Sequence, residues 1–427
     1  MLTREISRRF RFAVAFVAFT LSLAVSAQAQ TETVLYDFTG HSDGSDPLVG
    51  LAMDSAGNLY GTAGFTVFEL SPESGGGWSF NPIFSLTQGR LPESPLLIDA
   101  SGNLYGATFE GGTSGGCNNG EGCGIVYELT QTGGVWSETV LYNFTGGGGD
   151  SPIGNLAMDA AGNLYGTASN GGDFSCSRSG LGCGVVFELS HTGSAWVESV
   201  LHTFTDKNDG ALPMGGVTLD AAGNVYGTAS RGGNIKDCPA GQVVGCGVVF
   251  KLTSTSSGWT EQVLHSFTEN NNGYYPQATV TFDPAGNIYG TTMTGGGVYK
   301  LTPTTTGPWK YSVLKILSDK VGASPLAGVT LDAAGNVYGT TDFGGDVSAP
   351  KCDTNGCGVV FKLTPTASGP WTETAMHIFK GGTDGRYPVY SGVVLDSSGN
   401  LYGVTEEGGA LAECSGAGCG VVYQIVP

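Results

Sequence analysis

Two short segments carry the residue types of a nucleophilic serine site. Residues 40–44 (Gly-His-Ser-Asp-Gly) and 112–116 (Gly-Thr-Ser-Gly-Gly) both match the Gly-x-Ser-x-Gly pattern of serine hydrolases. In those enzymes the serine sits on a sharp turn between a strand and a helix. Neither segment lies between a predicted strand and a predicted helix, and in a chain with 72 glycines among 427 residues chance matches are expected. We therefore predict no serine nucleophile.

The histidines lack the spacing of a zinc site. His202, His265 and His377 occupy one position of a repeated unit, and Tyr36 and Tyr142 stand at that position in other units. Zinc is held by a defined set of imidazole, thiolate and carboxylate ligands. A position that histidine shares with tyrosine does not supply such a set, so we predict no metal site from these residues.

Acidic residues recur at a fixed place in the chain. The motif Asp-x-x-Gly-Asn-(Leu/Val/Ile)-Tyr-Gly begins at Asp54, Asp99, Asp159, Asp220, Asp283, Asp332 and Asp396. Glycine supplies a positive φ, and Asp and Asn side chains bond to nearby backbone, so the motif is typical of a hairpin turn. A calcium loop is the alternative interpretation of these carboxylates. Seven copies of one motif favour the turn, and we expect no other cofactor.

Each motif belongs to a longer unit that predicts four β-strands. In the clearest copy the strands are expected at residues 327–332, 336–340, 358–363 and 371–379, all rich in β-branched and aromatic residues. No stretch beyond the first 29 residues keeps a helical apolar period. Seven consecutive four-stranded units predict an all-β fold, a seven-bladed β-propeller.

The two ends of the chain predict how the ring closes. The seventh unit stops after its third strand, at residues 420–425. The missing fourth strand has its counterpart at the other end, because residues 32–38 (ETVLYDF) match residues 138–144 (ETVLYNF). The N-terminal strand is therefore expected to complete the last blade and remove its open edge. Residues 30–427 are expected to form one propeller domain.

The repeated elements also resemble a known family. The segments Asp-x-x-Gly-Asn-x-Tyr-Gly-Thr, Gly-Cys-Gly-Val-Val-Phe-x-Leu and Trp-x-Glu-Thr-Val-Leu are similar to the GloVer tandem repeats of secreted bacterial proteins. The resemblance covers roughly residues 32–427. It implies a propeller-like secreted or surface protein and no particular activity. Many members carry a C-terminal anchor, and the end of this chain at Pro427 favours release.

The cysteines follow the repeat. They fall as Cys117/Cys123, Cys176/Cys183, Cys238/Cys246, Cys352/Cys357 and Cys414/Cys419, one pair in each long loop between the second and third strands. The units around Tyr60 and Tyr289 have short loops and no cysteine. Paired cysteines within short loops of an exported chain predict five disulfides, each inside one unit.

The N-terminus and the net charge bound the location and the partners. Residues 1–29 combine a basic start, an apolar stretch of about 13 residues and a small-residue cleavage site near Ala29, which is the pattern of a signal peptide. We expect an extracellular or periplasmic protein with no membrane span in the mature chain, and a monomer. The formal net charge of −19 would repel nucleic acid.

Residues that break the seven-fold repetition are the candidate ligand-binding residues. In an up-and-down blade the second-to-third loop and the crossover to the next blade emerge on the same side. Just after the second strand the units stop agreeing, and rigid sheet positions what stands there. The candidates are Glu110, Asn170, Arg231, Asp342, Glu406 and Glu407. Drift in exposed loops is the alternative explanation of this variation.

A binding role is favoured over an enzymatic one. The leading hypothesis is a secreted or cell-surface binding or scaffold propeller, with a glycan or an extracellular protein at its loop-rich face. The alternative is a carbohydrate-active enzyme, a glycoside hydrolase or polysaccharide lyase, with opposed carboxylates such as Glu110 and Glu406 at the central top face. A third hypothesis is a structural surface protein without a discrete site.

Overall fold

The computed structural model of the protein describes residues 30–176, 180–193, 195–234, 236, 238, 245–269, 273–318, 322–367, 369–410, 412 and 414–427. The predicted signal peptide, residues 1–29, lies outside the described residues. No helix in the described part of the chain is long and apolar enough to cross a membrane.

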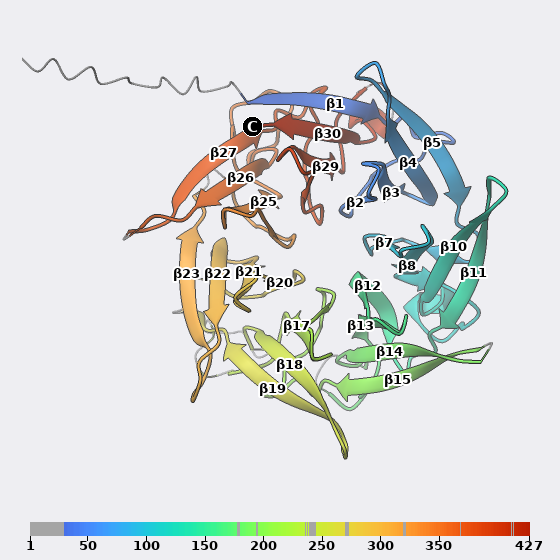
Figure 1. Cartoon of the computed structure of the whole chain (residues 1–427), viewed down its shortest axis with the longest axis vertical. Helices are drawn as coiled ribbons and strands as arrows, with labels where there is room; N and C mark the ends of the chain where they lie inside the picture. Colours follow the sequence, from blue (N-terminus) through green and yellow to red (C-terminus); the bar gives the residue numbers. More distant parts are fainter. Residues whose placement is uncertain are drawn as a thin grey trace, which may run out of the picture.

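Seven four-stranded antiparallel sheets are arranged as blades around a central axis (Figure 1), which confirms the predicted seven-bladed β-propeller. Blade 1 contains β2 (Ala52–Met53), β3 (Leu59–Ala63), β4 (Thr66–Pro72) and β5 (Trp78–Ser85). Blade 2 contains β7 (Leu97–Ile98), β8 (Leu104–Thr108), β10 (Ile125–Thr132) and β11 (Val135–Asn143). Blade 3 contains β12 (Asp150–Met158), β13 (Leu164–Asn170), β14 (Val185–Thr192) and β15 (Ala195–Thr203).

The second half of the ring repeats this order. Blade 4 contains β16 (Thr218–Leu219), β17 (Val225–Ala229), β18 (Val248–Thr255) and β19 (Gly258–Ser266). Blade 5 contains β20 (Thr281–Phe282), β21 (Ile288–Thr292), β22 (Gly297–Thr302) and β23 (Lys310–Ile316). Blade 6 contains β24 (Thr330–Leu331), β25 (Val337–Thr341), β26 (Val359–Thr364) and β27 (Thr372–Ile378). Blade 7 contains β28 (Val394–Leu395), β29 (Leu401–Thr405), β30 (Val421–Val426) and β1 (Thr31–Asp37).

The last blade is closed by the first strand, as predicted. β1 pairs antiparallel with β30, from Thr31 opposite Val426 to Asp37 opposite Val421. The N–H of Phe38 then donates to the carbonyl of Gly420 (3.1 Å), and the Phe38 ring is fully buried. In Figure 1, β1 lies as the outermost strand of its blade. The ring is thereby joined by hydrogen bonds between the two ends of the chain.

The repeated aspartate motif forms the turn between the first two strands of each blade. In blade 6 the N–H groups of Ala334 and Asn336 donate to Asp332 Oδ1 (3.0 and 2.8 Å). Asp332 Oδ2 accepts from Asn336 Nδ2 (2.6 Å) and from the Tyr338 hydroxyl (3.0 Å). Gly335 has a φ of +80°. Both carboxylate oxygens are thus used to hold the turn, and these bonds lower the pKa of Asp332 against the opposing effect of its burial.

The innermost strand is shorter than the sequence predicts. Residues 327–332 were expected as a strand, but only Thr330–Leu331 pair in the sheet as β24. Neighbouring blades approach one another closely at the axis, and the innermost strand has two residues in six blades and nine in blade 3. A Cβ on Gly154 of blade 3, for example, would lie 2.2 Å from the backbone nitrogen of Gly216 in blade 4.

The hydrophobic core lies between neighbouring blades. One cluster joins Leu51 and Phe68 of blade 1 to Tyr402 and Val422 of blade 7, and six similar clusters follow around the ring. The tryptophans that open the fourth strands pack at the outer part of these interfaces. Trp78 of blade 1, for instance, contacts the ring of Tyr402 edge to face (5.7 Å between centroids). Each blade is therefore stabilised by both of its neighbours.

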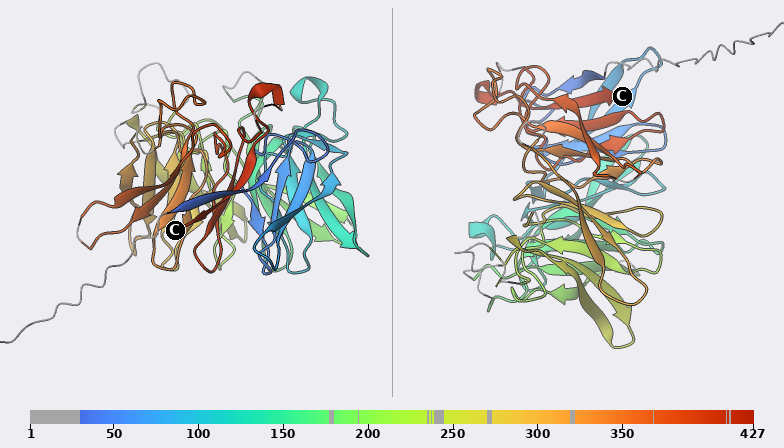
Figure 2. Two further views of the ribbon diagram at one scale, coloured as in Figure 1. Left: turned by 90° about the horizontal axis from the view of Figure 1, so that it is seen from above. Right: turned by 90° about the vertical axis from the view of Figure 1, so that its left-hand side faces the viewer.

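The two faces of the ring differ (Figure 2). The second-to-third loops and the crossovers between blades emerge on one side, which we name the loop face, and the tight hairpins emerge on the other. All five predicted disulfides are present, each within one loop of the loop face: Cys117–Cys123, Cys176–Cys183, Cys238–Cys246, Cys352–Cys357 and Cys414–Cys419. Blades 1 and 5, the short-loop blades, have no disulfide loop.

Candidate functional site

One backbone feature positions the start of every blade at the loop face. Just before a proline, each crossover places a non-glycine residue in the left-handed region, with φ between +52° and +60°. These residues are Asp46, Leu91, Ser151, Leu212, Tyr275, Ser324 and Tyr387. Such residues are uncommon outside glycine and asparagine and persist where the surrounding structure enforces them.

Hydrogen bonds on both sides hold this left-handed residue. In blade 7 the N–H of Tyr387 donates to the carbonyl of Cys357 in blade 6 (2.9 Å), and the carbonyl of Tyr387 accepts from the N–H of Glu406 (2.9 Å). The crossover thus ties the disulfide loop of one blade to the extension of the second strand in the next. The side chains that follow the second strands therefore stand on a rigid backbone.

Five of the six predicted binding residues follow the second strand of their blades on the loop face, and Asn170 is the last residue of the second strand β13. Four of the six form backbone β-pairs with the segment that enters the same blade. Glu110 pairs with Arg90 in a two-stranded sheet of β6 (Gly89–Arg90) and β9 (Glu110–Gly111). The other pairs are Asn170 with Asp150, Arg231 with Ala211, and Glu407 with Arg386. Asp342 and Glu406 immediately precede such pairs in blades 6 and 7. The predicted location on the loop face is therefore correct, whereas a binding role stays a prediction.

Asp342 and Glu406 are brought together at the interface of blades 6 and 7. Burial raises the pKa of Glu406 to about 7, and the negative charges of Glu407, Asp342 and Asp46 add to the rise. Burial, together with the charge of Asp353, raises the pKa of Asp342 to about 6. Asp342 is only 8% exposed, and neither carboxylate makes a hydrogen bond or ion pair with the described residues. Raised carboxyl pKa values of this kind concentrate at functional sites.

The other four predicted residues do not join this pair. The Glu407 carboxylate forms an ion pair with Arg386, and its charge still adds to the raised pKa of Glu406. The Arg231 guanidinium lies over the ring of Tyr275 (3.9 Å from the centroid), in the arrangement of a cation–π contact. Glu110 and Asn170 belong to blades 2 and 3, and no contact recorded for the described residues links them to Asp342 or Glu406.

Two residues of the site were missed by the sequence interpretation. Tyr390 lies in the innermost segment of blade 7, and burial followed by the charges of Glu93, Asp342 and Glu406 raises its pKa. Burial and the charge of Glu110 raise the pKa of Glu93, whose carboxylate also makes no hydrogen bond or ion pair within the described chain. We name Glu93, Asp342 and Glu406 around Tyr390 the axial carboxylate cluster.

The signals for these two residues were present in the repeat. Each crossover ends in a proline, and Glu93 is the one acid at the position that follows it. The other blades have Leu48, Ile153, Met214, Gln277, Leu326 and Val389 there. Tyr390 belongs to a segment one residue longer than its counterparts, because four residues follow Pro388 before Val393 and only three follow Pro325 before Val329. Both departures lie just before the innermost strands β7 and β28, whereas the prediction concerned residues that follow the second strand.

The central channel contains a small and a larger space. The Thr279 hydroxyl of blade 5 donates to Asn155 Oδ1 of blade 3 across it (3.1 Å). The space that Glu93 and Tyr390 line has a volume of about 40 Å³, enough for a few water molecules. The larger space, of about 280 Å³, is lined by inner residues of all seven blades. Asp342 and Glu406 follow second strands on the loop face, so a ligand that reaches the axial carboxylate cluster from that face sits at the channel mouth.

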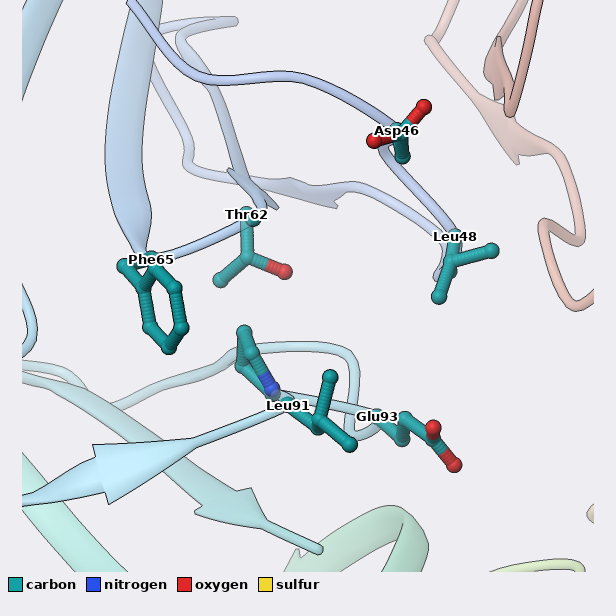
Figure 3. Close-up of a pocket in the computed structure, with 8 residues that line it drawn as sticks. Asp46, Leu48, Thr62, Phe65, Leu91 and Glu93 are labelled. Carbon is teal, nitrogen blue, oxygen red and sulfur yellow. The ribbon is translucent and has the colours of Figure 1, made fainter. Parts of the chain in front are cut away.

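A larger cavity opens beside the channel mouth, between blades 1 and 2 (Figure 3). Its volume is about 130 Å³, and we name it the notch. Phe65 and Thr62 come from blade 1 and face Leu91 of blade 2, and Asp46 and Glu93 lie toward the side of Leu48. Phe65 is 46% exposed and Leu91 is 41% exposed. The notch exists because blade 1 has no long loop between β3 and β4 to cover it.

The Gly-x-Ser-x-Gly match at residues 40–44 and the repeated histidine position have structural roles. Asp43 of the Gly-x-Ser-x-Gly match is buried and accepts hydrogen bonds from Thr39 and from the Tyr36 hydroxyl. His202 and His377 lie on outer strands beside Asp209 and Asp384 (3.4 and 3.3 Å). These residues hold crossovers against outer strands and lie away from the axial carboxylate cluster.

Similar solved structures share the architecture. A streptogramin B lyase superposes with a TM-score of 0.55 at 13% identity, covering 93% of this chain and 97% of that one. Two structures of virginiamycin B lyase from Staphylococcus aureus, one of them catalytically inactive and with quinupristin, each superpose with a TM-score of 0.54 at 13% identity, covering 93% of this chain and 99% of theirs. At this identity the likeness concerns the fold alone.

The sequence comparisons give the family. No curated protein matches the chain. The sequence profile of the Gloeobacter/Verrucomicrobia repeat matches residues 63–297 and 238–427, which include blades 2 to 6 whole and parts of blades 1 and 7. The resemblance noted from the repeated motifs is thereby confirmed, and the chain belongs to the Gloeobacter/Verrucomicrobia repeat family.

Proposed function

We propose that the protein is an exported binding propeller that holds a basic side chain of a peptide or protein partner at its axial carboxylate cluster. The observation that carries the proposal is the Asp342 carboxylate, which is nearly buried and has no hydrogen-bond donor or cation among the described residues. A buried carboxylate without a partner is costly, and a bound cation would remove that cost. Glu406 and Glu93 add to the negative potential at the same place.

An organic cation fits the cluster better than a metal ion. The described residues contain one group of three acidic, histidine or cysteine ligand atoms within 4.8 Å of one another, Cys117, Cys123 and Asp150. Those two cysteines are joined in a disulfide. The oxygens of the axial carboxylate cluster are spread more widely, which suits a guanidinium with five N–H donors in a planar fork.

Export and the choice of partner follow from the chemistry of the chain. Disulfides persist in oxidising compartments, and five are present. The net charge of −19 would draw a basic partner toward the protein. A neutral glycan offers hydroxyl donors to the carboxylates but no charge, so we propose a peptide or protein partner in preference to the glycan.

The proposal is tested by binding of a capped peptide with one arginine. We expect Ac-Gly-Arg-Gly-NH2 to bind, and the same peptide with citrulline, which keeps the shape and loses the charge, to bind more weakly. Asp342→Asn and Glu406→Gln should each weaken arginine-peptide binding about tenfold or more, because a hydrogen bond to a charged group is lost. Isothermal titration calorimetry measures these affinities.

The matched control is Glu121→Gln, which removes a carboxylate in an outer disulfide loop that pairs with Arg90. This variant should bind the arginine peptide as the parent does. Equal binding of the citrulline peptide, or an equal loss of affinity in Glu121→Gln, would contradict the proposal.

A second candidate function is general acid–base catalysis at the same cluster. Asp342 with a pKa of about 6 and Glu406 with a pKa of about 7 are suited to exchange protons near neutral pH. This pair replaces the pair Glu110 and Glu406 of the carbohydrate-active hypothesis, since Glu406 interacts with Asp342. Turnover of a polysaccharide panel that is lost in Glu406→Gln would favour it, and no turnover of any member would leave binding as the function.

A further inference from the structure

We infer that the notch is a subsite for a large apolar side chain adjacent to the basic one, so that the partner segment carries an aromatic or leucine-sized residue next to an arginine or lysine. The inference rests on the proposed function, because it takes the basic side chain to be held by the axial carboxylate cluster. It adds the part of the partner that would give specificity.

The walls of the notch are apolar and stand open. Phe65 and Leu91, 46% and 41% exposed, are among the most exposed large apolar side chains near the axis, and Leu48 and Pro92 complete the lining. Exposed apolar surface that is rimmed by polar groups marks interaction sites. A dry cavity of about 150 Å³ lined by such side chains accepts a benzene ring. The notch, at about 130 Å³, therefore fits a side chain of phenyl or isobutyl size.

The opening comes from the loop pattern of the blades. In blade 2 the segment after the second strand leads into a disulfide loop, and in blade 1 Ala63 and Thr66 are joined by two residues only. Blade 5, the other short-loop blade, has a comparable opening lined by Met293, Thr294, Leu317, Ala323 and Ser324. That lining carries no acid. Of these two openings, only the notch combines an apolar wall with carboxylates.

Two acids connect the notch to the axial carboxylate cluster. Glu93 lines both the notch and the channel space that Tyr390 also lines. Asp46 lines the notch, and its charge contributes to the raised pKa of Glu406. A cation held at the cluster therefore lies beside the notch, and its neighbour along a peptide chain can place a side chain there. Charge complementarity thus selects an occupant with a basic and an apolar group side by side.

The experiment compares four capped peptides on the full-length mature chain. Ac-Phe-Arg-Gly-NH2 and Ac-Gly-Arg-Phe-NH2 place a phenyl ring on either side of the arginine, Ac-Gly-Arg-Gly-NH2 lacks it, and Ac-Phe-Cit-Gly-NH2 lacks the charge. We expect one of the two phenylalanine peptides to bind about tenfold tighter than the glycine peptide, as burial of an aromatic side chain predicts. Phe65→Ala should reduce this preference to about twofold, because half of the apolar wall is lost.

Met293→Ala is the matched control, because it truncates an exposed apolar side chain at the opening of blade 5. It should leave the preference for phenylalanine unchanged. If the glycine and phenylalanine peptides bind equally, or if Phe65→Ala keeps the preference, the notch inference is overturned while the proposed function stands. If the citrulline peptide binds as tightly as its arginine counterpart, the proposed function fails.

Discussion

At the scale of the residue, the charged carboxylates of Asp342 and Glu406 destabilise the folded state. Asp342 is 8% exposed and Glu406 is half-buried, neither carboxylate has a donor in the described chain, and their charges repel one another. Native proteins avoid such groups unless they are used. Asp332 differs from both, because its carboxylate accepts four hydrogen bonds and its pKa is lowered. The repeated acids thus stabilise the ring, and the two exceptional acids destabilise it.

This destabilisation predicts a pH dependence of stability. Burial raises the pKa of Glu406 in the folded state to about 7, so the folded state binds a proton that the unfolded state has released. The free energy of unfolding should therefore fall as the pH rises from about 4.5 to 7. Glu406→Gln removes this cost and should stabilise the protein by about 1–3 kcal/mol at pH 8, but change little at pH 4.5.

Urea denaturation of the parent and Glu406→Gln at the two pH values measures this difference. Glu121→Gln, in an exposed loop, should leave stability nearly unchanged at both. A loss of stability in Glu406→Gln that is equal at both pH values would mean that the carboxylate has a partner that stabilises the fold.

At the scale of the element, the strand most particular to this chain is β1. Its pairing with β30 replaces the fourth strand that the seventh unit lacks, and Phe38 at its end is fully buried against Phe68. A chain that begins at Thr39 should unfold with a free energy roughly 3–6 kcal/mol lower than a chain that begins at Gln30, from the lost burial of Leu35 and Phe38 alone. It should also associate through the exposed edge of β30.

Thermal unfolding and size-exclusion chromatography of these two chains test the closure. A chain from Thr39 that melts at the same temperature as the longer chain and stays monomeric would contradict the closing role of β1.

The elements were largely predictable because the unit is repeated. The β-branched and aromatic composition and the turn motif locate the strands, and the copy of residues 138–144 at residues 32–38 locates the closing strand. The length of the inner strands was not predictable from the repeat, since six of them extend over two residues and β12 of blade 3 extends over nine. The left-handed residues before proline, such as Tyr387, were also missed, because their conformation is imposed by bonds to a neighbouring blade.

At the scale of the whole molecule, the closed ring determines which of the residues that break the repetition lie close together. The sequence singles out Glu110, Asn170 and Arg231 on the same grounds as Asp342 and Glu406. Blades 6 and 7 are consecutive in the chain, but only the closed ring brings Glu93 of blade 2 toward Tyr390 of blade 7. A repeat compared along the chain shows which residues are unusual. Their distance from one another depends on the curvature of the ring and the width of the channel.

The order of long and short loops around the ring is also a property of the whole molecule. Five disulfide loops stand around the loop face, and the short-loop blades 1 and 5 interrupt them. The interruption at blade 1 lies beside the axial carboxylate cluster through Glu93 and Asp46. The absence of a cysteine pair, which is visible in the sequence, thus coincides with the access route to the proposed site.

The central claim is that a basic side chain binds at the channel mouth on the loop face. The most direct measurement is a crystal structure of the protein with Ac-Phe-Arg-Gly-NH2. We expect the guanidinium nitrogens about 2.7–2.9 Å from the carboxylate oxygens of Asp342 and Glu406, the usual length of a charge-assisted hydrogen bond, and the phenyl ring against Phe65. A peptide bound at the hairpin face, or on the outer strands away from Tyr390, would contradict the account.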